Sequence, residues 1–240
     1  FVPDSLHWML QWNANSTIPG THFSEAAASL HTHIGVRCAF AQLLLSVKPS
    51  LELLHAAARV KEQLKRHISS LQPNASVAMY NAVHMRIEAD WLVHALGANI
   101  SNKTSLRNAA WSEALGAVRA IERAVDTAAH AQAKIESSIH GLGPPSSELQ
   151  QRLRIRLRAL PWFVASGVEC SHSWFEPLRR VGLQLYCLPP EPPHNNYRKA
   201  VVDGHVAEGA TIFVGRAGSS FSWIIAARRS AHVANTTAHL

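Results

Sequence analysis

The chain has 240 residues, of which 47% are hydrophobic and only 16% are charged. This composition excludes a chain that is disordered throughout, because it supplies enough apolar surface for a core in one large domain or two small ones. The net charge of +7 at pH 7 suits an acidic partner such as nucleic acid, a membrane surface or the phosphates of a nucleotide, without choosing among them.

The cysteines and the glycosylation motifs bear on the compartment. Cys38, Cys170 and Cys187 are far apart and form no Cys-x-x-Cys pair, which argues against a zinc ribbon or redox motif and allows at most one disulfide within the chain. Five Asn-X-Ser/Thr triplets favour a lumenal protein. They begin at Asn15, Asn74, Asn99, Asn102 and Asn235.

The chain opens on FVPDSLHW, without an initiator Met or a basic-then-apolar leader, and it holds no run of eighteen apolar residues. We therefore expect it to be a fragment, with any signal or anchor lying upstream. Contact with a membrane is expected only through such an anchor.

The first predicted elements are a helix, a strand and a second helix. Apolar residues recur at three- and four-residue intervals after Pro49-Ser50, which predicts an amphipathic helix over residues 51–71. After the breaker QPNAS, a short apolar run predicts a core strand at residues 77–85. The Ala-rich segment 104–139 predicts a second helix, ended by GLGPPSS at residues 141–147.

The basic stretch RLRIRLRAL at residues 152–160 alternates arginine with apolar residues. A ribbon that tracks the phosphates of a nucleic acid is one interpretation. Because no aromatic residues are interleaved, the solvated basic face of a helix or edge strand is favoured, and no nucleic-acid partner is expected.

The rest of the chain alternates strands with helices. This order predicts an α/β fold with a parallel sheet flanked by helices, and in such sheets ligands bind beyond the carboxyl ends of the strands. The predicted elements are a strand at 162–167, a helix at 171–182, a strand at 183–187, a partial helix at 197–210, a strand at 211–215 and a helix at 219–229.

Four ionisable residues, His84, Arg86, Glu88 and Asp90, lie at and just beyond the end of the strand predicted at 77–85. They therefore occupy the position where ligand sites of open α/β sheets gather. In a purely structural alternative, Arg86 pairs with Glu88 or Asp90 and His84 is a satisfied core histidine. A metal site using His84 and His94 is disfavoured, because their spacing is not that of a metal-binding helix.

A second stretch, residues 203–229, runs from the predicted strand TIFVG through a Gly-containing turn into a helix that opens with Ser219, Ser220, Phe221 and Ser222. Backbone N–H groups and hydroxyls at such a helix start form a natural seat for a diphosphate. The alternative is a serine-capped helix that binds no ligand.

Together these stretches resemble the GDP-fucose protein O-fucosyltransferase family. The resemblance spans about residues 45–230 and is carried by HMRIEADW at 84–91 and FVGRAGSSFS at 213–222, with Asp203 ten residues before Phe213. Two features depart from the family pattern. Arg216 stands where the family usually has Asn, and it adds a cation near the expected phosphates. The family's early Gly-rich segment with an Asn is not found.

The resemblance implies a GT-B architecture made of two Rossmann-like halves. Residues 1–97 would be the remainder of the N-terminal half, and residues 98–240 the C-terminal half that binds the nucleotide sugar. It also implies inverting transfer of fucose from GDP-fucose to a hydroxyl of a protein or glycan acceptor, without metal or cofactor, in the Golgi or endoplasmic reticulum. The alternative is a noncatalytic or truncated binding module with the same fold.

The resemblance also implies roles for individual residues. Arg86 would stabilise the departing phosphate, since a guanidinium grips phosphate oxygens without losing its proton. Glu88 or Asp90 would act as general base or, in the favoured interpretation, orient Arg86. Trp91, beside Asp90, is the one tryptophan expected at the cleft. The residues expected to bind GDP-fucose are His84, Arg86, Asp203, Ser219, Ser220 and Phe221.

Overall fold

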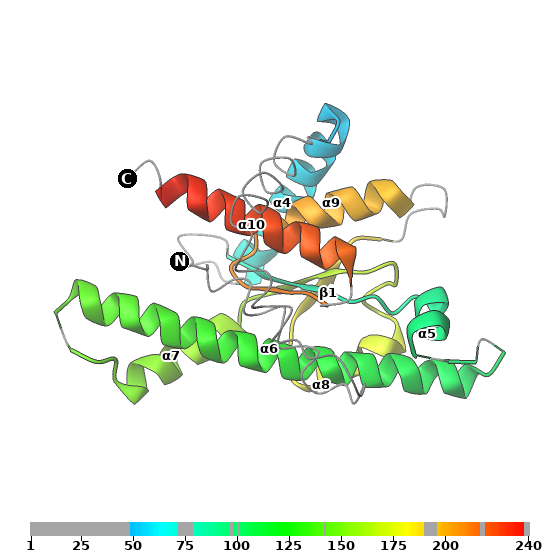
Figure 1. The fold of residues 1–240 in the computed structure, drawn as a ribbon, viewed down its shortest axis with the longest axis horizontal. Helices are drawn as coiled ribbons and strands as arrows, with labels where there is room; N and C mark the ends of the chain where they lie inside the picture. Colours follow the sequence, from blue (N-terminus) through cyan, green and yellow to red (C-terminus); the bar gives the residue numbers. More distant parts are fainter. Residues whose placement is uncertain are drawn as a thin grey trace, which may run out of the picture.

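The structure is a computed structural model that describes residues 49–71, 79–96, 98–99, 101–141, 143–189, 196–216 and 219–237. In these ranges a four-stranded parallel sheet lies between two layers of helices, which confirms the predicted α/β class (Figure 1). The spatial order is β3-β2-β1-β4, an arrangement compatible with a Rossmann-like fold. The strands are β1 (Asn81–His84), β2 (Trp162–Ala165), β3 (Leu185–Cys187) and β4 (Phe213–Val214).

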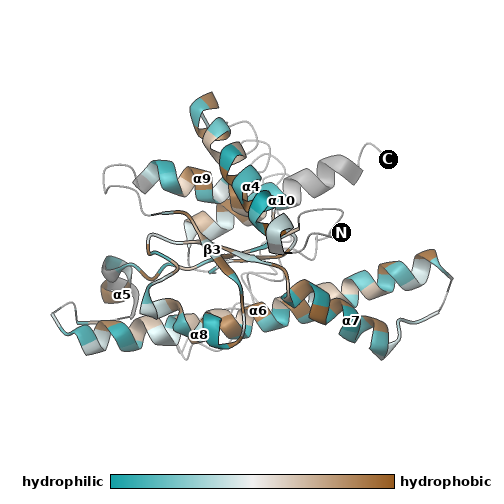
Figure 2. Cartoon of the chain, turned by 180° about the vertical axis from the view of Figure 1, so that it is seen from behind, coloured by the Kyte–Doolittle hydropathy of each residue, from teal (hydrophilic) through white to brown (hydrophobic). Residues whose placement is uncertain are grey.

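Both faces of the sheet are covered by helices. One face packs against α6 (Lys103–Ile139), α7 (Ser147–Arg158) and α8 (Glu176–Arg180). The other packs against α4 (Leu51–Leu71), α9 (Asn196–Glu208) and α10 (Ser220–Thr237). Figure 2 shows the hydrophobic colour on the strands and on stripes of the helices, with hydrophilic faces between them. The predicted helices at 51–71 and 104–139 are confirmed as α4 and α6.

Alternation along the strands supplies both layers of the core. Val83 and Val164 belong to the cluster on the α6 side, whereas their neighbours Ala82 and Phe163 belong to the cluster on the α9 side. Ala82 pairs with Phe163 in β2 and with Phe213 in β4, so one small side chain lies between two large ones. This complementarity favours one register of the three strands.

Asn81 is a fully buried polar residue in the central strand, and its side chain is satisfied on both sides. Its Nδ2 donates to the carbonyl of Leu157 at 2.8 Å, and its Oδ1 accepts from the N–H of Ile212 at 3.2 Å. Because an unpaired buried amide costs about 1–3 kcal/mol, these bonds also help to fix α7 and β4 against β1.

Helix α6 is capped by Asn102, whose Oδ1 accepts from the N–H groups of Thr104 and Ser105. Buried alanines along one side bring its backbone close to the sheet. Helix α7 then packs along it, with Arg154 paired to Glu122 and Asp126. The basic stretch at 152–160 therefore forms a helix that is partly ion-paired to α6. Among the described helices, none combines the length and apolar character needed to cross a membrane.

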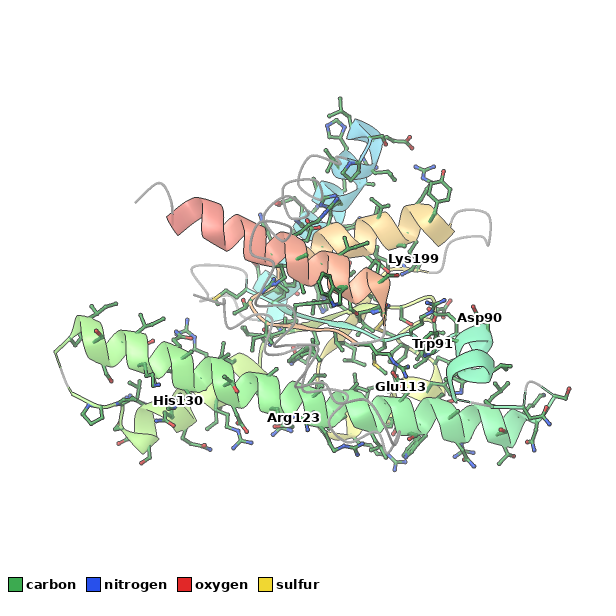
Figure 3. The ribbon with its side chains drawn as sticks, viewed as in Figure 1. Asp90, Trp91, Glu113, Arg123, His130 and Lys199 are labelled. Carbon is green, nitrogen blue, oxygen red and sulfur yellow. A yellow bond between two sulfur atoms is a disulfide. The ribbon has the colours of Figure 1, made fainter. Side chains whose placement is uncertain are left out.

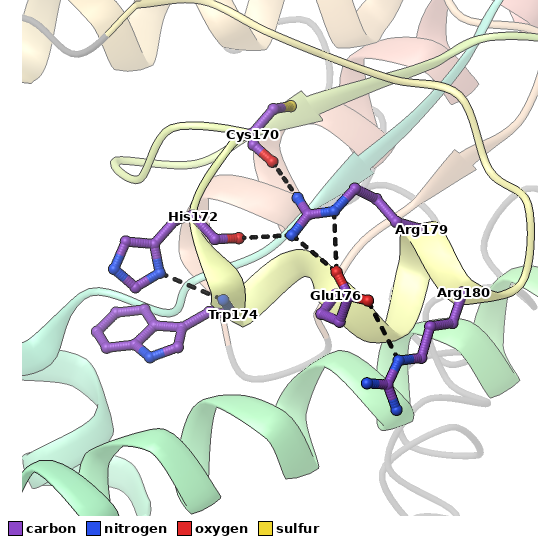
Figure 4. Close-up of polar contacts among 6 residues, drawn as sticks. All are labelled: Cys170, His172, Trp174, Glu176, Arg179 and Arg180. Atoms are coloured by element: carbon purple, nitrogen blue, oxygen red, sulfur yellow. Dashed lines mark hydrogen bonds and ion pairs between the residues drawn. The ribbon is translucent and has the colours of Figure 1, made fainter.

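The segment between β2 and β3 departs from the single helix predicted at 171–182. It forms a 3₁₀ turn (Ser173–Phe175) followed by the short α8, and the cap is the His172 ring, whose Nδ1 accepts from the N–H of Trp174, in place of a serine hydroxyl. Arg179 organises this loop by donating to the carbonyls of Cys170 and His172 and to Glu176 (Figure 4). These carbonyls and the carboxylate hold the chain in a compact loop.

A disulfide between Cys170 and Cys187 ties this loop to the end of the edge strand β3. The sequence allows at most one disulfide within the chain, without saying which pair forms it. Asn99 and Asn102 are exposed, as glycosylation would require. The third cysteine and the other three glycosylation motifs lie outside the described residues or have no described side chain. They are Cys38, Asn15, Asn74 and Asn235.

The predicted boundary between residues 97 and 98 does not separate two sheets in the described part of the chain. β1 precedes this boundary, yet it pairs with β2 and β4, which follow it. The helices α5 (Ala89–Leu96), α6 and α7 are thus a connection within one sheet. The boundary was placed by resemblance, whereas strand pairing puts β1 between β2 and β4 in the described sheet.

Candidate functional site

The sheet topology marks one place for a ligand. From β1 the chain moves outward to β2 and β3, with its connections on the α6 face, and then returns through α9 to place β4 on the other side of β1. The direction of winding therefore reverses between β1 and β4. In open α/β sheets ligands bind outside the carboxyl ends of the strands at such a reversal.

The two sequence motifs meet at this point. His84, the last residue of β1, lies with its Nδ1 2.7 Å from the Oγ of Ser222 in the first turn of α10. The ring of Phe221 lies 4.6 Å from the His84 ring, centroid to centroid. Burial, aided by Arg86 and Arg216, lowers the pKa of His84 to about 3, so this imidazole is neutral at pH 7.

Arg86 extends from the segment after β1 and stacks on Trp91. Its Cζ lies 4.7 Å from the centre of the indole ring, and no described residue forms a hydrogen bond or ion pair with its guanidinium. The structural alternative, in which Arg86 pairs with Glu88 or Asp90, is therefore wrong within the described residues. Trp91 provides the contact instead, through a cation–π interaction.

Glu88 links the ends of two strands. Its Oε1 accepts from the N–H of Gly167, just beyond β2, at 2.7 Å. A side chain at Gly167 would collide with this carboxylate, since an added Cβ would lie 2.7 Å from Oε1. Asp90 is exposed in the first turn of α5. Asp90 and Trp91 lie at the same end of the sheet as Glu113 (Figure 3).

Asp203 lies on α9, on the opposite layer, and is buried beside Lys199. The Nζ of Lys199 donates to Asp203 Oδ2 at 2.6 Å and to the carbonyl of Ser166 at 2.7 Å. Burial raises the pKa of Asp203 to about 6 against the opposing effect of Lys199, and the nearby Glu88 adds to the rise. Lys199 lies four residues before Asp203, a spacing that would have revealed the pair on a helix.

Three polar atoms at this end of the sheet are buried and have no hydrogen-bond partner among the described residues. They are Glu88 Oε2, Trp91 Nε1 and Asp203 Oδ1. Buried polar groups in folded proteins are nearly always bonded, so an unpartnered set calls for an explanation. Two free carboxylate oxygens and one indole N–H would complement a ligand that carries several donors and at least one acceptor.

The serines at the start of α10 differ in exposure. Ser219 and Ser222 are buried, whereas Ser220 is exposed and Phe221 is half-buried. Ser222 Oγ also accepts from the N–H of Arg216, at 3.0 Å, which closes the turn between β4 and α10. Gly215 is required here, because an added Cβ would lie 2.7 Å from the Cβ of Ser222.

The structure adds one side chain, Glu113, that the sequence did not assign to the site. Glu113 reaches from α6 and pairs with Arg216, Oε1 to Nη1, at 2.8 Å. The Cζ of Arg216 lies 4.6 Å from the centre of the same Trp91 ring that Arg86 contacts. No sequence signal linked Glu113 to Arg216, because they are 103 residues apart.

Other possible sites carry less chemistry. No group of three or more metal-ligating side chains occurs among the described residues, and the side chain of His94 lies outside them. A shallow surface pocket of about 220 Å³ on α6 is lined by Thr104, Arg107, Asn108 and Trp111. None of the predicted site residues lines this pocket. No protein-family model, curated protein or solved structure matches this chain.

Proposed function

We propose that the chain is a glycosyltransferase of GT-B architecture that transfers fucose from GDP-fucose to a hydroxyl of a protein or glycan acceptor. One observation carries the proposal. The His84 to Ser222 contact joins the two motifs of the O-fucosyltransferase resemblance across the β1/β4 reversal, although the residues are 138 positions apart. A ligand at this edge would meet both motifs at once.

The arrangement suits a nucleoside diphosphate because it offers two kinds of contact. Arg86, whose guanidinium is free of ion pairs within the described residues, suits phosphate oxygens. Asp203 Oδ1 and Glu88 Oε2 suit the N–H and O–H donors of a nucleoside or sugar. The N–H groups that begin α10, with Ser219 and Ser220 beside them, add donors for the diphosphate.

In the proposed reaction the acceptor oxygen attacks the anomeric carbon of fucose from the face opposite the diphosphate. The bond from that carbon to the β-phosphate oxygen breaks, GDP leaves with the electron pair, and the configuration inverts. Arg86 stabilises the charge that grows on the leaving oxygen. The hydroxyl proton passes to a carboxylate, and Glu88 suits this role better than Asp90, since it has a buried oxygen without a partner.

The proposal is tested first by binding. GDP should raise the melting temperature of the chain and UDP should raise it less, because ligand bound to the folded state adds stability by mass action. An equal effect of both nucleotides, or of neither, would remove the donor assignment. Release of GDP from GDP-fucose in the presence of an acceptor extract is then measured.

The role of Arg86 is tested by substitution. Arg86→Ala should reduce GDP release to background, while Arg156→Ala, on the exposed side of α7, should leave it unchanged. Glu88→Gln should retain GDP binding and lose transfer if Glu88 is the base. Normal transfer by Arg86→Ala would take Arg86 out of the site.

A noncatalytic module of the same architecture is the second candidate. The described strands form one sheet, whereas the proposed architecture has two halves. A chain that binds GDP but releases none from GDP-fucose, even when it is extended upstream, would be such a module.

A further inference from the structure

Arg216 is held at the β1/β4 reversal by both its backbone and its side chain. Its N–H donates to Ser222 Oγ, and its guanidinium is largely buried, with 14% of the side chain exposed. The position follows directly from β4 and Gly215, so the side chain projects from the carboxyl edge of the sheet.

The charges around Arg216 do not balance. Arg216 and Arg86 both lie over the Trp91 ring, at 4.6 and 4.7 Å from its centre. Glu113 pairs with Arg216, whereas no described carboxylate pairs with Arg86. Burial lowers the pKa of Arg216 against the opposing effect of Glu113, and the neighbouring Arg86 lowers it further. Two neighbouring cations with only one carboxylate between them, in a partly buried setting, are costly unless an anion joins them.

We propose that Arg216 is a second anion-binding guanidinium, which binds the diphosphate together with Arg86, and that Glu113 is the counter-ion of Arg216 that competes with the diphosphate for it. This inference rests on the proposed nucleotide-sugar site and names a contact within it. The ligand chemistry is that of a diphosphate, whether free or as part of a nucleotide.

The geometry distinguishes this role from that of a strut, meaning a salt bridge that only joins β4 to α6. Such a salt bridge would stabilise the fold most if the Arg216–Glu113 pair were remote from other cations. Here the pair instead lies beside Arg86, which raises the electrostatic cost of the folded state without a ligand. The like charge is useful only where an anion is bound, as at other phosphate sites built from paired arginines.

The test measures binding of inorganic pyrophosphate, GDP and guanosine by calorimetry to the wild-type chain and to Arg216→Gln. The variant should bind pyrophosphate and GDP about tenfold or more weakly, the usual effect of losing a hydrogen bond to a charged group. Guanosine affinity should stay the same, because the nucleoside does not touch Arg216. Arg156→Gln serves as the control for a lost surface charge.

Glu113→Gln provides the opposite perturbation. It keeps the size of the side chain and removes the competing charge, so pyrophosphate affinity should rise at least twofold. A strut would instead give unchanged or weaker binding, because the site would lose its fixed geometry. If Arg216→Gln fails to fold, as judged by circular dichroism, Glu113→Gln alone decides the question.

The outcomes separate the two proposals. Wild-type binding of GDP and pyrophosphate that Arg216→Gln matches within twofold would overturn the role of Arg216 and leave the proposed function standing. A wild-type chain that binds neither ligand would overturn both. Weaker GDP binding by Arg216→Gln, together with tighter pyrophosphate binding by Glu113→Gln, supports Arg216 and Glu113 in these roles.

Discussion

Two buried groups at the carboxyl edge of the sheet respond to acid in opposite directions. His84 is neutral in the folded chain because burial lowers its pKa from 6.5 to about 3. Stability from this group is present above pH 6.5 and is lost as the pH falls, since the unfolded chain then binds a proton that the folded chain refuses. For Asp203 the pKa is raised from 3.8 to about 6, so acid relieves the cost of its buried charge between these values.

The magnitudes follow from about 1.4 kcal/mol for each pKa unit, taken as an upper bound. Lowering the pH from 6.5 to 4.5 should cost about 3 kcal/mol through His84. Between pH 6 and pH 4.5, protonation of Asp203 should raise the free energy of unfolding by about 2 kcal/mol. The two effects nearly cancel in the wild-type chain, and single substitutions expose them. His84→Asn should become more stable as the pH falls, and Asp203→Asn should become less stable.

The assay is urea unfolding followed by circular dichroism at several pH values between 7 and 4.5. Only the change with pH is compared, because each substitution also shifts the stability at pH 7. His130→Asn, an exposed histidine on α6, is the control and should follow the wild type. If the pH course of His84→Asn coincides with that of the wild type, burial does not hold this ring neutral.

Three further predictions concern the packing of the fold. Gly215→Ala should lower the free energy of unfolding by about 1–3 kcal/mol, because its Cβ would lie 2.7 Å from that of Ser222, and an unchanged urea midpoint would mean that this turn relaxes freely. Gly204→Ala, in helix α9, should instead raise the free energy of unfolding by about 0.5–1 kcal/mol, because the nearest atom to the added Cβ, Cε2 of Phe221, would lie at 3.6 Å. A loss of stability would contradict the packing described for this helix. Replacing Cys170 and Cys187 together by serine should lower the free energy of unfolding by about 3 kcal/mol, the loop-closure value for residues 17 apart. Urea unfolding without reductant measures this change. A change near zero would mean that Arg179 stabilises the loop without the disulfide.

Hydrophobic periodicity predicted most of the elements, because the period of a helix or buried strand is a local property. It placed α4 and α6 to within one residue at their ends, and the alternation of elements predicted a parallel sheet. It placed His84 and Arg86 at the carboxyl end of β1 for the same reason. The single helix expected at 171–182 was wrong, since Arg179 and the disulfide stabilise a compact loop there.

Local sequence patterns could not predict which residues contact the site residues. Glu113 reaches Arg216 only because α6 runs across the sheet, and the carboxylate of Glu88 meets Gly167 only because β1 and β2 are neighbours. Such contacts depend on strand order, which a single sequence does not state. The spacing of Lys199 and Asp203 is the exception, because four residues on a helix bring two side chains together.

The position of β1 has a consequence for how the chain folds as it is synthesised. This strand is made first, yet its neighbours come much later, and Asn81 bonds to Ile212, 131 residues downstream. Helices α6 and α7, which are joined by a short connection, can pack together before the partner strands of β1 have been synthesised. Until β4 has left the ribosome, the centre of the sheet has an open edge on which other chains can pair, so slow translation between β2 and β4 should favour aggregation.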